Sequence, residues 1–110
     1  MSEREYFGHL ARRPGMFVSP KSVHSVMAFI VGYDQAARRH GGRGLDGWRE
    51  WLASHYQVGS NLIWEAQIWQ IAFPGWKGGW EVTTEQEDHV LQVLFELLDK
   101  FLSEREARHS

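Results

Sequence analysis

Histidine and carboxylate side chains are the groups in this sequence able to bind a metal ion or transfer a proton. The six histidines are scattered, and no His-x-x-x-His pair places two ligands on one helix face. Glu85, Glu87 and Asp88 follow Thr84, which is the pattern of a first helical turn, where carboxylates stabilise unpaired N–H groups. The chain has no cysteine, which excludes thiolate ligands and disulfides. We therefore expect no catalytic residue, no metal and no cofactor.

All six tryptophans lie in one stretch of the chain, which ends at Trp80. Three of them fit the apolar side of a predicted helix and are expected in the core: Trp48, Trp51 and Trp69. Trp64 lies off the inner side of its helix, and Trp76 and Trp80 flank a glycine-rich loop in which full burial is difficult. Because surface aromatic residues mark interfaces, we predict that Trp64, Trp76 and Trp80 bind a partner.

Charge is unevenly distributed along the chain, although the net charge is only −2. Residues 1–55 contain eight Lys and Arg against five Asp and Glu, whereas residues 56–110 contain four against nine. One interpretation is chance variation on a solvated surface, and the other is an acidic face that meets a basic protein. In the second case the carboxylates expected at the interface are Glu81, Glu85, Glu87 and Asp88. This charge balance argues against general nucleic-acid binding.

Helices are predicted to position these side chains. Apolar residues at helical spacing indicate a first helix over 3–12. A second helix is expected to begin at Ser19-Pro20, where the serine caps and the proline takes the first helical position, and to end at His40-Gly41-Gly42.

A third and a fourth helix are expected in the tryptophan-rich stretch. Asp46 is the predicted cap of the third, and Ser60 or Asn61 that of the fourth, which spans about 62–73. The predicted inner side of this fourth helix consists of Leu62, Ala66, Trp69 and Phe73. The residues from 74 to 80 are predicted to form a loop, with a short extended piece at 81–82 possible after it.

The last helix has the clearest sequence signals. Thr84-Glu85-Gln86-Glu87 has the form of a capping box, and helical spacing continues to about Arg105. Its apolar residues form two adjacent stripes: Val90, Leu94, Leu97 and Phe101, with Leu91, Leu98 and Leu102 beside them. The predicted fold is an all-α, single-domain bundle of about five helices over residues 1–110.

Composition places the chain among ordinary globular proteins, since 43% of its residues are apolar and 24% are charged. No apolar run approaches the roughly 20 residues that a membrane span needs. Residues 1–5 are charged and lack the apolar core of a secretory signal. We therefore expect a cytoplasmic protein that does not bind membranes.

The segment Arg13-Pro14-Gly15-Met16-Phe17 resembles a motif near the N-terminus of type II topoisomerase ATPase subunits such as gyrase B. In that family the next helix carries an acidic general base and an asparagine that holds magnesium. Residues 22–34 contain neither Glu nor Asn, and the family's later Asp-x-Gly-x-Gly string is absent. Because nothing is left to hold a metal or activate water, ATPase activity is not expected.

The same motif occurs in small bacterial proteins that this chain resembles along most of its length. Those proteins continue into a helix with Gly-Tyr, then carry Leu-x-Gly-aromatic-x-x-Trp, and end in an acidic, leucine-rich helix. The corresponding residues here are Arg13 to Phe17, Gly32-Tyr33, Leu45 to Trp51 and Leu94 to Leu102. Some such proteins are thought to be immunity partners in bacterial toxin systems. The resemblance implies an immunity-type protein and transfers no residue-level role.

Three functional hypotheses remain open. The first is a non-enzymatic protein-binding module, most concretely an immunity-type protein that binds and neutralises a cognate bacterial toxin. The alternative is a small-molecule-binding or enzymatic helical domain with a Trp-lined apolar pocket, in which Tyr33, His55 and Glu65 supply the polar groups. A third is a homodimer formed through the leucine-rich last helix.

Overall fold

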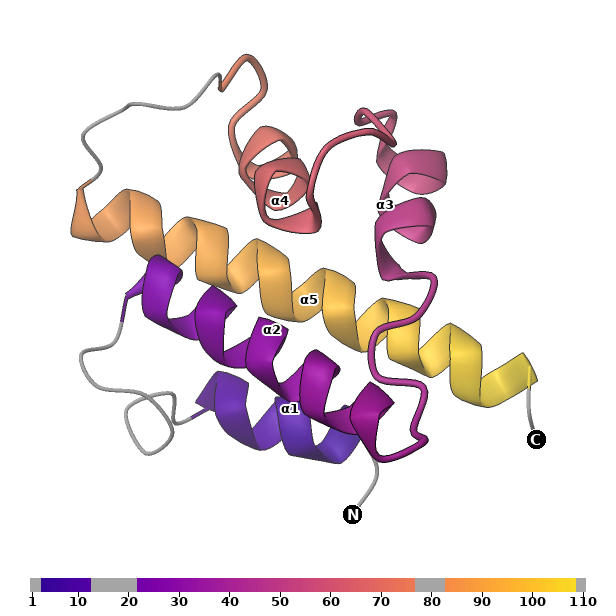
Figure 1. Cartoon of the computed structure of the whole chain (residues 1–110). Helices are drawn as coiled ribbons and strands as arrows, with labels where there is room; N and C mark the ends of the chain where they lie inside the picture. Colours follow the sequence, from indigo (N-terminus) through magenta and orange to yellow (C-terminus); the bar gives the residue numbers. More distant parts are fainter. Residues whose placement is uncertain (1–2, 13–21, 77–82, 109–110) are drawn as a thin grey trace.

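The computed structural model describes residues 3–12, 22–76 and 83–108 of the chain. These residues form five α-helices (Figure 1). The helices are α1 (Glu3–Arg12), α2 (Val23–Arg39), α3 (Trp48–Tyr56), α4 (Trp64–Ala72) and α5 (Thr84–Arg108). The prediction of an all-α bundle of about five helices is confirmed.

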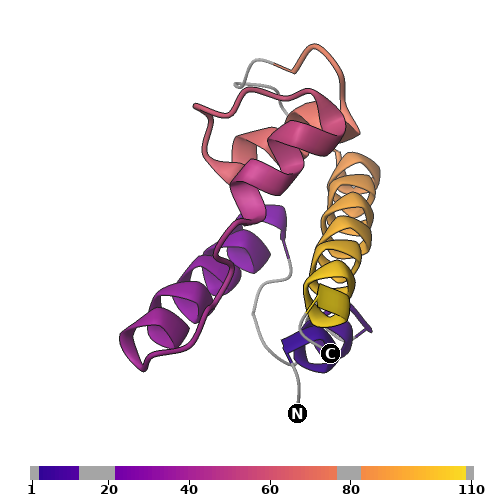
Figure 2. The ribbon, with the colours of Figure 1, turned by 90° about the vertical axis from the view of Figure 1, so that its right-hand side faces the viewer.

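The long helix α5 is the element against which α1, α2 and α4 pack. α1 lies beside it in the opposite direction, since Arg4 pairs with Asp99 at 2.7 Å while Arg12 lies near Asp88. Figure 2 shows α3 and α4 together across one end of the molecule, with α2 and α5 running away from them. None of the described helices combines the length and the apolar character needed to cross a membrane.

Both predicted apolar stripes of α5 are buried. The residues concerned are Val90, Leu91, Leu94, Leu97, Leu98, Phe101 and Leu102. They pack against the buried side chains of the other helices and form one core. The leucine-rich face of α5 is therefore buried against the other helices of the same chain. A homodimer formed through this face would have to displace those helices.

The tryptophans of α3 lie in the core, as predicted. Trp48 is 1% exposed, and its ring centroid lies 5.3 Å from that of Phe101 on α5. Trp51 is also buried and donates its indole N–H to Glu104 Oε2 at 2.7 Å. Trp69, which was also predicted to lie in the core, is only half-buried and packs against the edge of this core.

Two predicted helix caps are corrected by the structure. α2 is capped by Ser22 and not by Ser19, because the Ser22 side chain accepts the N–H of Ser25 at 3.1 Å. The segment Ser19-Pro20 itself lies outside the described residues, as does 13–17. α3 begins after Gly47 and not after Asp46, since the chain enters the helix with a φ of +85°, which glycine adopts without strain.

α4 is shorter than predicted and turned about its axis. Ile63 occupies the cap position, and neither Ser60 nor Asn61 does. The buried residues are Gln67 and Ile68, whereas the four residues of the predicted inner side are only half-buried. The Gln67 Nε2 donates to the backbone carbonyls of Arg49 at 3.2 Å and Gly59 at 3.0 Å, which offsets part of the cost of burying this amide.

The capping box of α5 exists, but one residue earlier than predicted. The Gln86 side chain accepts the N–H of Thr83 at 2.9 Å, and the Thr83 hydroxyl accepts the N–H of Gln86 at 3.1 Å. Gln86 replaces the expected glutamate, since either side chain provides the required oxygen. The helix continues to Arg108, beyond the predicted end near Arg105.

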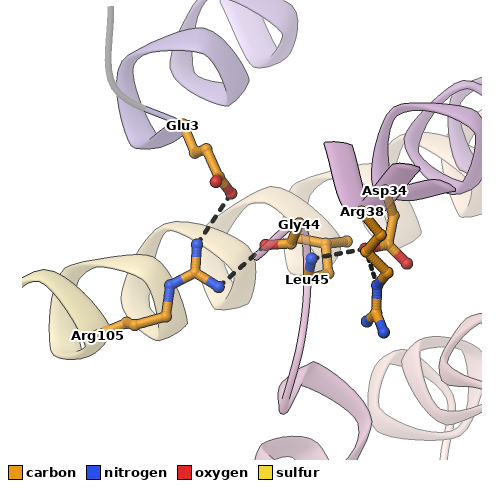
Figure 3. Close-up of polar contacts among 6 residues, drawn as sticks. All are labelled: Glu3, Asp34, Arg38, Gly44, Leu45 and Arg105. Carbon is orange, nitrogen blue, oxygen red and sulfur yellow. Dashed lines mark hydrogen bonds and ion pairs between the residues drawn. The ribbon is translucent and has the colours of Figure 1, made fainter. Parts of the chain in front are cut away.

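A set of hydrogen bonds, which we call the polar clasp, joins α1, α2, the α2–α3 loop and α5 (Figure 3). Its members are Glu3, Asp34, Arg38, Gly44, Leu45 and Arg105. Arg105 donates to the Glu3 carboxylate and to the Gly44 carbonyl, both at 2.9 Å, and its side chain is only 12% exposed. Asp34 Oδ1 accepts the N–H of Leu45 at 2.7 Å and Arg38 Nε at 2.8 Å. The clasp thereby holds the loop that leads into α3.

Gly44 is required at its position in the clasp. Its φ of +53° lies in the left-handed region, and an added Cβ would overlap Asp34 Oδ1 and lie 3.0 Å from the Asp34 carbonyl oxygen. Only glycine therefore permits this approach of the loop to α2.

Candidate functional site

An open groove of about 650 Å³ lies between α2 and α4. The residues that line it are Val23, His24, Met27, Ala28 and Val31 of α2, Ile63, Glu65, Ala66 and Trp69 at α4, Trp76 after α4, and Glu87 of α5. We call it the α2–α4 groove. Its size falls within the range of ligand pockets, and most of its side chains are apolar.

Helix α2 is apolar on two adjacent sides, and this produces one wall of the groove. Val26 and Ile30 are fully buried in the core. His24, Ala28 and Val31 follow at spacings of four and three residues, so they share a different side of the helix, which faces the groove. α2 therefore exposes apolar surface that its core contacts do not use.

The other wall is built from stacked tryptophans. The rings of Trp69 and Trp76 lie 5.4 Å apart between centroids and 18° from parallel. The turn that follows α4 brings them together, because Gly75 adopts a φ of +92° and the N–H of Trp76 donates to the Phe73 carbonyl at 3.0 Å. A backbone turn thus presents a broad aromatic surface to the groove.

Ile63 is 61% exposed, and no other large hydrophobic residue among the described ones is classed as exposed. It also occupies the cap position of α4, where its side chain makes no capping hydrogen bond. Ser, Thr, Asp or Asn at a cap stabilises a helix by about 1 kcal/mol relative to an apolar residue. Ile63 therefore contributes neither a cap nor core packing, and its side chain adds to the apolar surface of the groove.

Two carboxylates lie among these apolar side chains. Glu65 is in the first turn of α4 and Glu87 in the first turn of α5, and both are half-buried. Both side chains therefore lie near the N-terminal, positive end of a helix dipole. The groove thus combines an apolar surface with negative charge.

The groove continues into a more polar hollow of about 340 Å³. The two share Val31, Ile63 and Glu65. The residues that only the second hollow contacts are Asp34, Arg38, Leu45, Asp46, Gly47, Trp48, Arg49, Glu50 and Trp64. The combined surface therefore follows α2 from its first turn almost to its end.

The structure brings some of the predicted partner-binding residues together and separates others. Trp76 and Glu87 line the α2–α4 groove, and Trp64 lines its polar continuation, where its ring packs near that of Trp48. Glu85 is exposed and lines neither hollow. Asp88 is exposed on the side that faces α1. Trp80 and Glu81 lie outside the described residues.

The three polar residues of the alternative hypothesis do not meet in one pocket. Tyr33 stacks on Tyr6 with ring centroids 5.1 Å apart, and burial together with the charge of Glu3 raises its pKa. His55 stacks on Trp51 at 4.4 Å, and its Nδ1 lies 2.9 Å from the Trp51 carbonyl oxygen. Only Glu65 lines the α2–α4 groove.

For several of the groove residues, the sequence gives no sign that they line a groove. Met27 and Val31 belong to a helix with apolar residues on two adjacent sides, and Ile63 lies just before the first residue of α4. The only available signal was the breadth of the apolar face of α2, which exceeds what one neighbouring helix covers.

The part of the chain that the structure describes contains no group of three or more His, Asp or Glu side chains placed to hold a metal ion. The arrangement is suited to holding an apolar body that also carries positive charge. Searches with the sequence and the structure match no protein-family model, no curated protein and no solved structure.

Proposed function

We propose that this chain is a non-enzymatic protein-binding module whose partner docks in the α2–α4 groove. Within that class, the motif resemblance favours an immunity-type protein that binds and neutralises a cognate bacterial toxin in the cytoplasm. The proposal needs no catalytic residue, cofactor or metal.

The observation that carries the proposal is the stacked pair of Trp69 and Trp76 beside the exposed Ile63. Large aromatic side chains supply most of the binding energy in protein interfaces, and they do so at the centre of apolar patches. Covering apolar surface stabilises a complex by about 25 cal/mol per Å² removed from water. A partner that covers this apolar surface therefore lowers the free energy of the complex.

The charge of the groove supports the same proposal. Glu65 and Glu87 add negative potential at the apolar surface. Complementary charge speeds the association of two proteins and selects between partners. A toxin with a basic active-site cleft is a partner of the required kind.

Co-expression with the product of the adjacent gene tests the proposal. We expect the two proteins to co-purify, and we expect the chain to rescue growth if that product is toxic. Trp76→Ala should weaken the complex about 30-fold, since the loss of an aromatic hot spot costs about 2 kcal/mol. Phe95→Ala is the matched control, because this half-buried aromatic residue lies on α5 outside the groove. A complex that tolerates Trp76→Ala as well as it tolerates Phe95→Ala contradicts the docking surface.

A second candidate function, the binding of a small apolar molecule, is favoured by the volume and aromatic wall of the same groove. Tryptophan fluorescence and thermal unfolding across a panel of metabolites test it. Quenching that disappears in Trp76→Ala supports this function, whereas no quenching and no thermal shift with any compound rejects it.

A further inference from the structure

Apart from the uncapped N–H groups in the first turn of α4, few free backbone groups are present on the walls of the α2–α4 groove. Two of these walls are the helices α2 and α4, and the N–H and C=O groups within a helix already bond to one another. The described residues contain no β-strand, so they offer no strand edge for pairing with an extended peptide. An extended segment would therefore bury unpaired backbone groups, which is costly. A helix satisfies its own backbone hydrogen bonds and avoids this penalty.

The length of the surface also fits a helix. The groove and its polar continuation together follow α2 from Val23 to Arg38. At a rise of about 1.5 Å per residue this is about 22 Å, or roughly four helical turns. The surface is apolar towards Val23 and polar towards Arg38, so an occupant must change character along its length.

The charges on the groove select the chemistry of the occupant. Glu65 and Glu87 are half-buried next to apolar side chains, where their charges are screened less than on an open surface. The same carboxylates disfavour a nucleic acid or an anionic lipid surface, because both carry negative charge.

We propose that the groove holds a cationic amphipathic α-helix of a partner protein. Its apolar side lies on Ala28, Val31 and Trp76, and its Lys or Arg side chains lie beside Glu65 and Glu87. This inference rests on the proposed function, because it specifies the kind of segment by which the partner is recognised.

Two synthetic helical peptides of about 15 residues test the inference. Both carry the same leucine stripe at helical spacing and alanine elsewhere, and they differ only in having lysines or glutamates beside the stripe. Titration of the full chain, followed by tryptophan fluorescence and calorimetry, should show that the lysine peptide binds at least about tenfold more tightly. Equal binding of the two peptides contradicts the charge assignment.

Matched variants locate the charge effect. Glu87→Gln and Glu65→Gln should each weaken the lysine peptide about three- to fivefold. Glu85→Gln is the control, because Glu85 lies in the same turn of α5 as Glu87 but outside the groove. If Glu85→Gln weakens binding as much as Glu87→Gln does, the peptide senses overall charge and the inference fails.

The helical form is tested by a lysine peptide with one central proline, which should lose binding because proline breaks a helix. If this peptide binds as well as the parent, the occupant is not a helix. Light scattering tests a second copy of this chain as the occupant: a dimer that Trp76→Ala dissociates overturns the inference.

The two proposals can fail separately. If the lysine peptide does not bind while Trp76→Ala still disrupts the complex with the adjacent gene product, a protein docks in the groove by other chemistry and only the cationic helix is wrong. If Trp76→Ala also leaves that complex intact, both proposals fall.

Discussion

The polar clasp and the α2–α4 groove lie on the same helix α2 and differ in what covers them. In the clasp, Arg105 and Asp34 each make two short hydrogen bonds to other parts of the chain. In the groove, the half-buried tryptophan pair and the exposed Ile63 leave part of their apolar surface uncovered by the described residues. The polar groups of the clasp bind one another within the chain, whereas the apolar surface of the groove is open to a ligand.

This difference separates the two roles that side chains of one small domain can have. Buried polar groups stabilise a fold only when their partners are in place, so the clasp is sensitive to the loss of any member. Apolar groups at an open groove contribute little to folding and much to binding, because their surface leaves water only in the complex. Variants at the clasp should therefore change stability, and variants at the groove should change binding.

The largest effect on stability is expected from Gly44→Ala. At this position alanine must adopt the left-handed φ that glycine has here. Its Cβ also displaces the Asp34 side chain from its hydrogen bonds to Leu45 and Arg38. Together these should lower the free energy of unfolding by about 3 kcal/mol, measured by urea titration with circular dichroism. Gly41→Ala is the control, since Gly41 also has a positive φ but an added Cβ meets open space, and it should cost only about 1 kcal/mol. Equal losses in the two variants would falsify the claim that contact with Asp34 matters.

Arg105→Met should lower the free energy of unfolding by about 2 kcal/mol. The change keeps the side-chain packing on α5 but leaves the Glu3 carboxylate and the Gly44 carbonyl without their donor. Urea titration measures the loss, and Arg108→Met at the exposed end of the same helix should cost under about 0.5 kcal/mol. A loss as small for Arg105→Met as for the control would remove the clasp as a stabilising element.

Trp76→Ala, a variant in the groove, should change binding more than stability. It removes a stacked ring pair but no core residue, so the free energy of unfolding should fall by about 1 kcal/mol or less. Thermal unfolding measures this, and the same variant should weaken partner binding strongly. A loss well above about 2 kcal/mol would place Trp76 among the core residues and end the distinction between the two regions.

The smallest effect is expected from Ile63→Ser, and it has the opposite sign. Serine can accept an N–H at the start of α4, whereas the exposed isoleucine makes no cap, so stability should rise by about 0.5 kcal/mol. Partner binding should weaken in the same protein, as expected where a functional residue is retained at the cost of stability. Ile63→Ala separates the two effects, since it removes the apolar contact without supplying a cap. A stabilised Ile63→Ala would mean that exposure, and not capping, explains the gain.

Much of the fold was predictable because its signals are local. The two stripes of α5, the helix over residues 3–12 and the left-handed end of α2 at Gly41 all follow from residues a few positions apart. The orientation of α4 was not predictable, because buried Gln67 depends on the carbonyls of Arg49 and Gly59, which belong to other parts of the chain. Because glutamine is polar, a helical pattern places it on the surface. Its hydrogen-bond partners lie far away in the sequence and come near it only in the folded chain.

The candidate site was predictable only in part. Trp76 and Glu87 were both chosen from the sequence and both line the groove, whereas Glu85 and Asp88, chosen by the same argument, point elsewhere. Adjacent residues in a helix project about 100° apart, so a run of carboxylates cannot all face one surface. The direction of each depended on how α5 is rotated in the bundle.

The amino-acid sequence by itself determined the helical class, the approximate helix positions and the core stripes of α5, since these depend on apolar periodicity and local capping. Tertiary structure alone decided that Arg105 reaches Gly44, and that Trp69 and Trp76 face α2 across an open groove. The physical reason is the short range of the interactions involved. Hydrogen bonds and apolar contacts act over a few ångströms, so residues distant in sequence combine into a clasp or a groove only after the helices have packed.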